Sequence, residues 1–164
     1  MNQKYDVTWN PSRDLTSPIH WESDHFVLVK PNTDLFDSIL TEDFIESVFA
    51  VMARSPNQTF LVSTKYPERM FKWFGHSMRA GFVYAASSQD LGKDNKRFKK
   101  DGSDWLGWPL PNVSLGLIVE NQSVVANLCI PDILMVPNRL RLADVDTRGS
   151  KVTFTDILFK GGSK

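Results

Sequence analysis

Short apolar runs recur along the chain, and each run ends in polar residues that open a helical pattern. The runs 25–29, 59–63 and 113–119 are predicted to be strands, and the polar clusters 30–34, 64–68 and 120–122 follow them. In parallel α/β sheets the carboxyl ends of the strands share one edge, where ligands collect. The pattern therefore predicts where a site lies, but it does not specify the chemistry of that site.

Helical spacing and cap residues predict the segments between these strands. Thr41 is a suitable N-cap for a helix over 42–52, and Pro67 is suitable as the first residue of a helix that ends at Gly75. Residues 121–128 are predicted to be helical, and 139–143 and 151–155 alternate as strands do. The region 77–108 breaks the pattern and is interpreted as an exposed loop.

This order predicts one α/β domain over residues 1–164. Strands that alternate with helices favour right-handed crossovers, and hence a partial (β/α) barrel or an open, mostly parallel sheet with outer helices. Such a sheet has edges or an apolar face that must be covered. We therefore expect a homodimer or a larger protein partner.

The amino-acid composition and net charge argue against some classes of function but do not identify one. The 164 residues are 41% hydrophobic and 23% charged, and the formal net charge is zero. These values are typical of a globular protein and give no general attraction to nucleic acid or to anionic membranes. No apolar run approaches the roughly 20 residues of a membrane-spanning helix. The single cysteine, Cys129, cannot form an internal disulfide, so we expect a cytoplasmic protein.

The first candidate site is the predicted carboxyl edge of the sheet. Lys65 and Arg69 lie beside the helix N-terminus at Pro67, where free amides and a cation would bind a phosphate or carboxylate. The alternative is that this shape serves stability alone, and Asn121 would equally cap the following helix. The candidate residues of this edge are Asp34, Thr64, Lys65, Arg69, Glu120, Asn121 and Asp144.

The second candidate site is a basic segment that contains aromatic residues. Five cations lie within the eight residues 93–100, and tryptophans follow shortly afterwards. Such a segment can grip single-stranded nucleic acid, or its tryptophans can anchor a protein partner. Nearby aspartates dilute the positive field, so a solvated loop is the alternative. The candidate residues are Lys96, Arg97, Phe98, Lys99, Lys100, Trp105 and Trp108.

Metal binding and nucleophilic catalysis receive little support. His20 and His25, with Glu22 and Asp24, match no common zinc spacing, so a polar loop is the simpler interpretation. Cys129 has no Cys-His-Asn arrangement, and a buried structural cysteine is the simpler interpretation. We expect no metal, no cofactor and no catalytic residue.

Three stretches together resemble a known family. They are 8–11 (Thr-Trp-Asn-Pro), 34–36 with 44–70, and 108–122 (beginning Trp-Pro-Leu-Pro-Asn-Val). They resemble the three-cysteine-motif phage proteins, which are thought to be similar to radical S-adenosylmethionine enzymes, distantly of the spore photoproduct lyase kind. The resemblance covers most of residues 34–145 and the short N-terminal motif. It implies a barrel-like fold and location in the cytoplasm of a phage host.

The chain departs from that family where its chemistry resides. Leu15 stands where the first of three cysteines is expected, and residues 12–25 contain no cysteine. One thiolate cannot replace the three that hold an iron–sulfur cluster. The family's C-terminal portion is also missing. The resemblance therefore implies a truncated, degenerate member without the radical chemistry.

The leading hypothesis is a non-catalytic, phage-derived protein that binds a protein partner, such as a host or defence component. The alternative is a protein that retains binding of a nucleotide or S-adenosylmethionine-like small molecule at the predicted rim. A third hypothesis is nucleic-acid binding through the 93–108 loop.

Overall fold

Six strands form one sheet in the part of the chain that the structure describes. The computed structural model describes residues 6–89, 107–119, 140–145 and 152–157. The strands are β1 (Val7–Trp9), β2 (Phe26–Val29), β3 (Thr59–Thr64), β4 (Val113–Val119), β5 (Leu140–Val145) and β6 (Val152–Ile157). They are arranged in the order of the sequence, β1-β2-β3-β4-β5-β6. The first five are parallel, and β6 pairs antiparallel to β5. The predicted α/β class with an open, mostly parallel sheet is confirmed.

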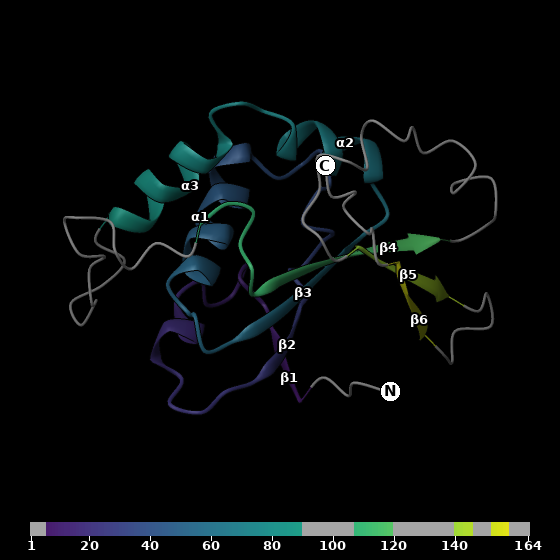
Figure 1. Cartoon of the computed structure of the whole chain (residues 1–164), viewed down its shortest axis with the longest axis horizontal. Helices are drawn as coiled ribbons and strands as arrows, with labels where there is room; N and C mark the ends of the chain where they lie inside the picture. Colours follow the sequence, from purple (N-terminus) through teal and green to yellow (C-terminus); the bar gives the residue numbers. More distant parts are fainter. Residues whose placement is uncertain (1–5, 90–106, 120–139, 146–151, 158–164) are drawn as a thin grey trace, which may run out of the picture.

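The helices cover one side of this sheet (Figure 1). They are the short 3₁₀ helix η1 (Ser17–His20) and the α-helices α1 (Glu42–Ala53), α2 (Pro67–Phe74) and α3 (Arg79–Ser88). A sequential strand order with crossovers of constant hand places successive connections on the same face. No helix in the described part of the chain is long and apolar enough to cross a membrane.

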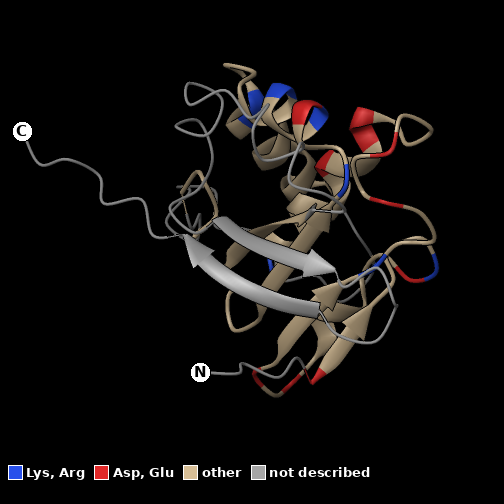
Figure 2. Ribbon diagram, turned by 90° about the vertical axis from the view of Figure 1, so that its right-hand side faces the viewer, with Lys and Arg blue, Asp and Glu red and all other residues tan. Residues whose placement is uncertain are grey.

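The hydrophobic core lies between the helices and alternate residues of the strands. The register aligns Val27, Phe60 and Val113 in one row and Val29, Val62 and Leu115 in the next. All six side chains are buried in one cluster, together with Ile45, Val48, Phe49 and Met52 of α1 and Met70, Phe71, Trp73 and Phe74 of α2. None of β1–β4 contains a charged residue, and Figure 2 shows charges on the helices and connecting segments. Burial of this strand surface stabilises the two-layer arrangement.

Several predicted boundaries agree closely with the structure. The strand predicted at 113–119 is β4, and the helix predicted from Pro67 to Gly75 is α2, with Gly75 as its C-cap. The Thr41 side chain caps α1 by accepting a hydrogen bond from the Phe44 amide at 3.2 Å. The strands predicted at 139–143 and 151–155 correspond to β5 and β6. The predicted helix 121–128 lies outside the described residues.

One prediction about regular structure is wrong. The sequence pattern predicts a loop over 77–108, but α3 occupies Arg79–Ser88. The first 24 residues show no sustained period, and the structure has β1 and η1 there. The strand β1 is only three residues long, too short to show an alternating pattern.

The junction between α1 and β4 is fixed by one amide side chain. Asn112 Nδ2 donates to the main-chain carbonyl oxygens of Met52 at 3.0 Å, Ser55 at 3.1 Å and Gln58 at 3.2 Å. These carbonyls belong to the end of α1 and the turn that leads into β3. Because helix ends leave carbonyl groups without intrahelical donors, Asn112 acts as a C-terminal cap supplied from a distant part of the chain.

Candidate functional site

The carboxyl ends of β2 and β3 form a cleft that we call the carboxyl-edge cleft. Its volume is about 510 Å³. Apolar residues of β2, β4 and the following loop provide part of its wall, and polar residues of the segments 30–37 and 63–66 provide the rest. It is lined by Leu28, Val29, Lys30, Pro31, Asn32, Thr33, Asp34, Leu35, Asp37, Ser63, Lys65, Tyr66 and Ile118. This size and mixture are typical of small-molecule sites.

Asp34 joins the two loops that border the carboxyl-edge cleft. Its Oδ1 accepts hydrogen bonds from Thr64 Oγ1 at 2.7 Å and from the Phe36 amide at 2.9 Å, and its Oδ2 accepts from the Lys65 amide at 2.7 Å. The structure thus brings together Asp34, Thr64 and Lys65, as expected for residues at the ends of neighbouring parallel strands. Because Asp34 already accepts three hydrogen bonds, it is a poor general base and a good support for the loops.

Arg69 is predicted to be an anion ligand, but its guanidinium binds main-chain carbonyl groups, and it does not line the cleft. Its guanidinium donates to the main-chain carbonyl oxygens of Phe36 at 3.2 Å, Leu40 at 2.6 Å and Asp37. It therefore holds the turn that precedes α1. Of the other predicted rim residues, Glu120 and Asn121 lie outside the described residues. Asp144 is located in β5 by its pairing with Val119 and Thr153.

Asp37 and Tyr66 form a hydrogen-bonded pair at the mouth of the cleft. The Ile39 amide, followed by the hydroxyls of Thr33 and Tyr66, donates to the Asp37 carboxylate and holds the pKa of Asp37 below its ordinary value. The negative charge of Asp37 in turn raises the pKa of Tyr66. Sequence analysis missed Tyr66, although it belongs to the polar cluster that follows β3.

Replacing Asp37 with asparagine should lower the pKa of Tyr66. The neutral amide no longer opposes ionisation of the phenol 3.2 Å away. The measurement is a spectrophotometric titration of tyrosinate, with Tyr66→Phe identifying the Tyr66 component. An unchanged Tyr66 titration in Asp37→Asn would contradict the pairing.

Trp108, predicted to be an exposed partner anchor, instead contacts the aromatic core. Its ring centroid lies 5.5 Å from that of Phe74 in a stacked arrangement and 6.0 Å from those of Phe49 and Trp73. Gly107 precedes it with a φ of 88°, a left-handed conformation that glycine tolerates. The remaining candidate residues of that segment, from Lys96 to Trp105, lie outside the described residues.

Trp108→Ala should therefore act on stability. Loss of the ring contacts should lower the free energy of unfolding by about 2 kcal/mol, less than for a fully buried ring because Trp108 is half-buried. Trp108→Phe should retain most of the stability. Urea denaturation checks both variants, and a stability of Trp108→Ala equal to that of the unmodified protein would place the side chain outside the core.

His25 and His76 have different neighbours. His25 Nδ1 lies 3.2 Å from an Asp6 carboxylate oxygen, and its ring contacts Trp21 edge-on. His76 Nδ1 accepts from the Met78 amide at 3.2 Å, and its ring lies against Phe82. Within the described ranges, no group of three or more His, Cys, Asp or Glu residues could hold a metal ion. The segment where an iron–sulfur cluster would require cysteines instead places Leu15 against the hydrophobic core.

Comparison with known proteins places the chain in a family without a described activity. The model of the family described as a protein of unknown function (DUF5131) matches residues 2–156. No curated protein matches the chain. No solved structure matches it either.

Proposed function

Since the chain belongs to the DUF5131 family, whose description assigns no activity, we propose from its site that it is a non-catalytic protein that binds an anionic small molecule in the carboxyl-edge cleft. The observation that carries this proposal is the state of the two carboxylates that line the cleft. Asp34 and Asp37 each accept at least three hydrogen bonds from neighbouring groups. Their negative charge is therefore already compensated in large part.

The cations of the cleft are placed to bind a negative group. Lys30 lies at the end of β2 and Lys65 at the end of β3, and these strands are hydrogen-bonded neighbours. No described residue pairs with the Lys30 ammonium group. The N-terminus of α2, where Pro67 is the first residue, is close by and adds a positive partial charge. Leu28, Leu35 and Ile118 offer apolar contacts, so the ligand class is an anion with an apolar or aromatic body, such as a nucleoside monophosphate.

Titration calorimetry with AMP and adenosine tests the proposal. AMP should bind at least tenfold more tightly than adenosine, because only AMP carries the phosphate that contacts the lysines. Lys30→Met should weaken AMP binding about tenfold, the effect of losing one charged hydrogen bond. Lys72→Met, an exposed cation on α2 outside the cleft, is the matched control and should leave the affinity unchanged. Equal binding by the two lysine variants would reject the site.

A protein partner is a second candidate, and it rests on exposed apolar side chains. Ile39 is 74% exposed, Met78 57% and Phe82 41%. Met78 and Phe82 are four residues apart at the start of α3, so they occupy the same side of that helix. This side of α3 is the place for a partner or a second copy. Light scattering should then give a mass above that of the 18.7 kDa monomer, and Met78→Asp should restore the monomer.

We further propose a phage origin and descent from a radical-enzyme-like scaffold whose cluster was lost. The sequential parallel sheet with helices on one side supports a barrel-like ancestor, and the apolar Leu15 supports the loss of ligands. Action on a host process rests on analogy alone. Nucleic-acid binding through residues 93–108 stays a prediction, which a steep salt dependence of binding would support.

A further inference from the structure

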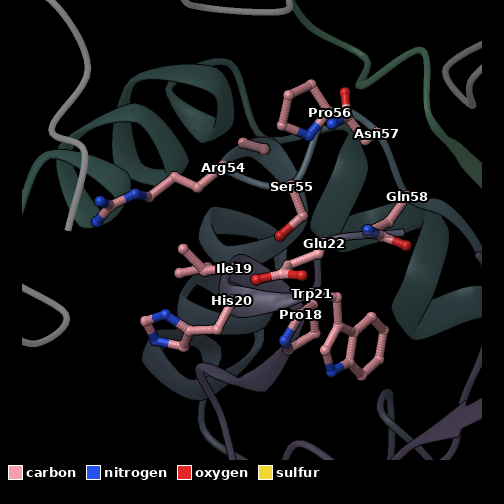
Figure 3. Close-up of a pocket in the computed structure, with 11 residues that line it drawn as sticks. Pro18, Ile19, His20, Trp21, Glu22, Arg54, Ser55, Pro56, Asn57 and Gln58 are labelled. Carbon is pink, nitrogen blue, oxygen red and sulfur yellow. The ribbon is translucent and has the colours of Figure 1, made fainter. Parts of the chain in front are cut away.

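A second pocket, which we call the amino-edge pocket, lies at the opposite end of the sheet. It has a volume of about 610 Å³ and is formed where α1 turns into β3 and where η1 leads toward β2 (Figure 3). The carboxyl-edge cleft begins at the other end of β3, so the two cavities are separate. The amino-edge pocket is lined by Pro18, Ile19, His20, Trp21, Glu22, Ala53, Arg54, Ser55, Pro56, Asn57 and Gln58.

Hydrogen bonds of Gln58 fix the two walls of the amino-edge pocket relative to each other. Gln58 is 2% exposed, and its amide donates to the Ser23 carbonyl at 2.9 Å and accepts from the His25 amide at 2.9 Å. Ser55 Oγ donates to the Val51 carbonyl at 2.9 Å, and Asn112 holds the carbonyl groups of the turn. A pocket with fixed walls loses little conformational entropy when it binds a ligand.

The charges around the amino-edge pocket favour a cation. Glu22 has no hydrogen-bond or ion-pair partner in the described part of the chain, and in Figure 3 its carboxylate lies among the other labelled residues. The Arg54 guanidinium extends away from them in the same view, and its Nη1 donates to the Gln89 carbonyl at 3.4 Å. The end of α1, which contributes Ala53 and Arg54, carries the negative partial charge of a helix C-terminus.

The remaining lining residues favour an organic cation over a metal ion. Trp21 presents an aromatic ring, and Pro18, Ile19 and Pro56 add apolar surface. An alkyl stem would pack on these groups while its ammonium group contacts Glu22. Calcium or magnesium would require several oxygen ligands, whereas Glu22 is the only carboxylate of the pocket lining.

We propose that the amino-edge pocket binds an alkylammonium cation, with Glu22 as the counter-ion and Trp21 as the aromatic contact. This inference is independent of the function proposed for the carboxyl-edge cleft. Glu22 is exposed, so the ion pair is weak and should contribute about fivefold to the affinity.

An NMR titration of the isotope-labelled protein with butylammonium chloride tests this proposal. We expect saturable shifts of the Trp21 indole N–H and of the Ser55 and Gln58 amides. Butanol, the neutral isostere, should give no saturable shift. Glu22→Gln should weaken binding about fivefold. Asp24→Asn removes the same charge from an exposed position of the same loop outside the pocket, and it should leave the affinity unchanged.

Three results would overturn the proposal. They are shifts that do not saturate, shifts spread evenly over the surface, and equal weakening by Glu22→Gln and Asp24→Asn. The last result would show a general effect of charge. Because Glu22 and Asp24 are both exposed, neither substitution should disturb the fold, and the spectra without ligand check this directly.

Discussion

Replacing Arg79 with methionine should lower the free energy of unfolding by about 3–5 kcal/mol. Arg79 is the first residue of α3 and is only 2% exposed. Its guanidinium donates to Glu42 Oε2 at 2.8 Å, to Glu46 and to the Trp73 carbonyl at 2.9 Å, and it lies 4.4 Å from the centroid of the Trp73 ring. The substitution removes all these contacts and leaves Glu46, which is 15% exposed, without its cation.

The loss in free energy of unfolding caused by Arg79→Met should depend on pH. Burial raises the pKa of Glu46 despite the neighbouring guanidinium, whereas the hydrogen bond from Arg79 lowers the pKa of Glu42. A lowered pKa stabilises the fold above the unfolded-state pKa, and this contribution is lost as the pH falls. A raised pKa has the opposite effect, and without Arg79 the Glu46 pKa should rise further. The stability difference between the two proteins should therefore shrink as the pH falls, through Glu46 above the ordinary glutamate pKa of 4.5 and through Glu42 below it.

Urea denaturation at several pH values measures these effects. Arg79→Lys is the matched control, because it keeps the charge but lacks the planar fork of donors, and it should be intermediate in stability. Adding Glu46→Gln to Arg79→Met should recover part of the loss by removing the unpaired carboxylate. If Arg79→Met lowers the free energy of unfolding by less than about 1 kcal/mol, as for an exposed ion pair, the contacts of Arg79 with Glu42, Glu46 and Trp73 are not needed for the fold.

The second large effect should come from Asn112→Asp, which we expect to cost about 3 kcal/mol. The side-chain amide lies between three carbonyl oxygens at the end of α1, and a carboxylate there loses the donors and repels those oxygens. Asn112→Ala, which loses the donors without adding charge, should cost about 2 kcal/mol.

The order of these two variants is the informative result. Thermal and urea denaturation should place Asn112→Asp below Asn112→Ala in stability. The reverse order would mean that the three carbonyl groups do not face position 112. Pro111 is the preceding residue and is exposed, so Pro111→Ala offers a nearby control with a small effect.

Local chemistry explains which elements could be predicted from the sequence. Thr41 with two following acids, Pro67 with Gly75, and the apolar run of β4 each carry their signal within a few residues. In α3 the pattern is weak, because Gly81 and several small residues interrupt it and its most buried large side chains include Arg79. An arginine in a sequence normally indicates a surface position, so nothing local marks this helix as packed.

The candidate site is predictable in position but not in the roles of its residues. The strand-end rule locates Asp34, Thr64 and Lys65 together. It cannot show that the Arg69 guanidinium donates hydrogen bonds to carbonyl groups of residues 36–40, because these residues come about 30 positions earlier in the chain. The contact of Trp108 with the core has no local sequence signal for the same reason, since its partners Phe49 and Trp73 are distant in sequence. The amino-edge pocket has no sequence signal, because it forms only when η1 meets the end of α1.

The sequential strand order has a consequence for synthesis on the ribosome. Each strand from β2 to β6 pairs with the strand that was made just before it. The sheet can therefore grow one strand at a time as the chain emerges, without waiting for a distant segment to be translated. When β4 emerges, Asn112 also reaches the end of α1. The helix α1 therefore acquires its C-terminal cap only after residue 112 has left the ribosome.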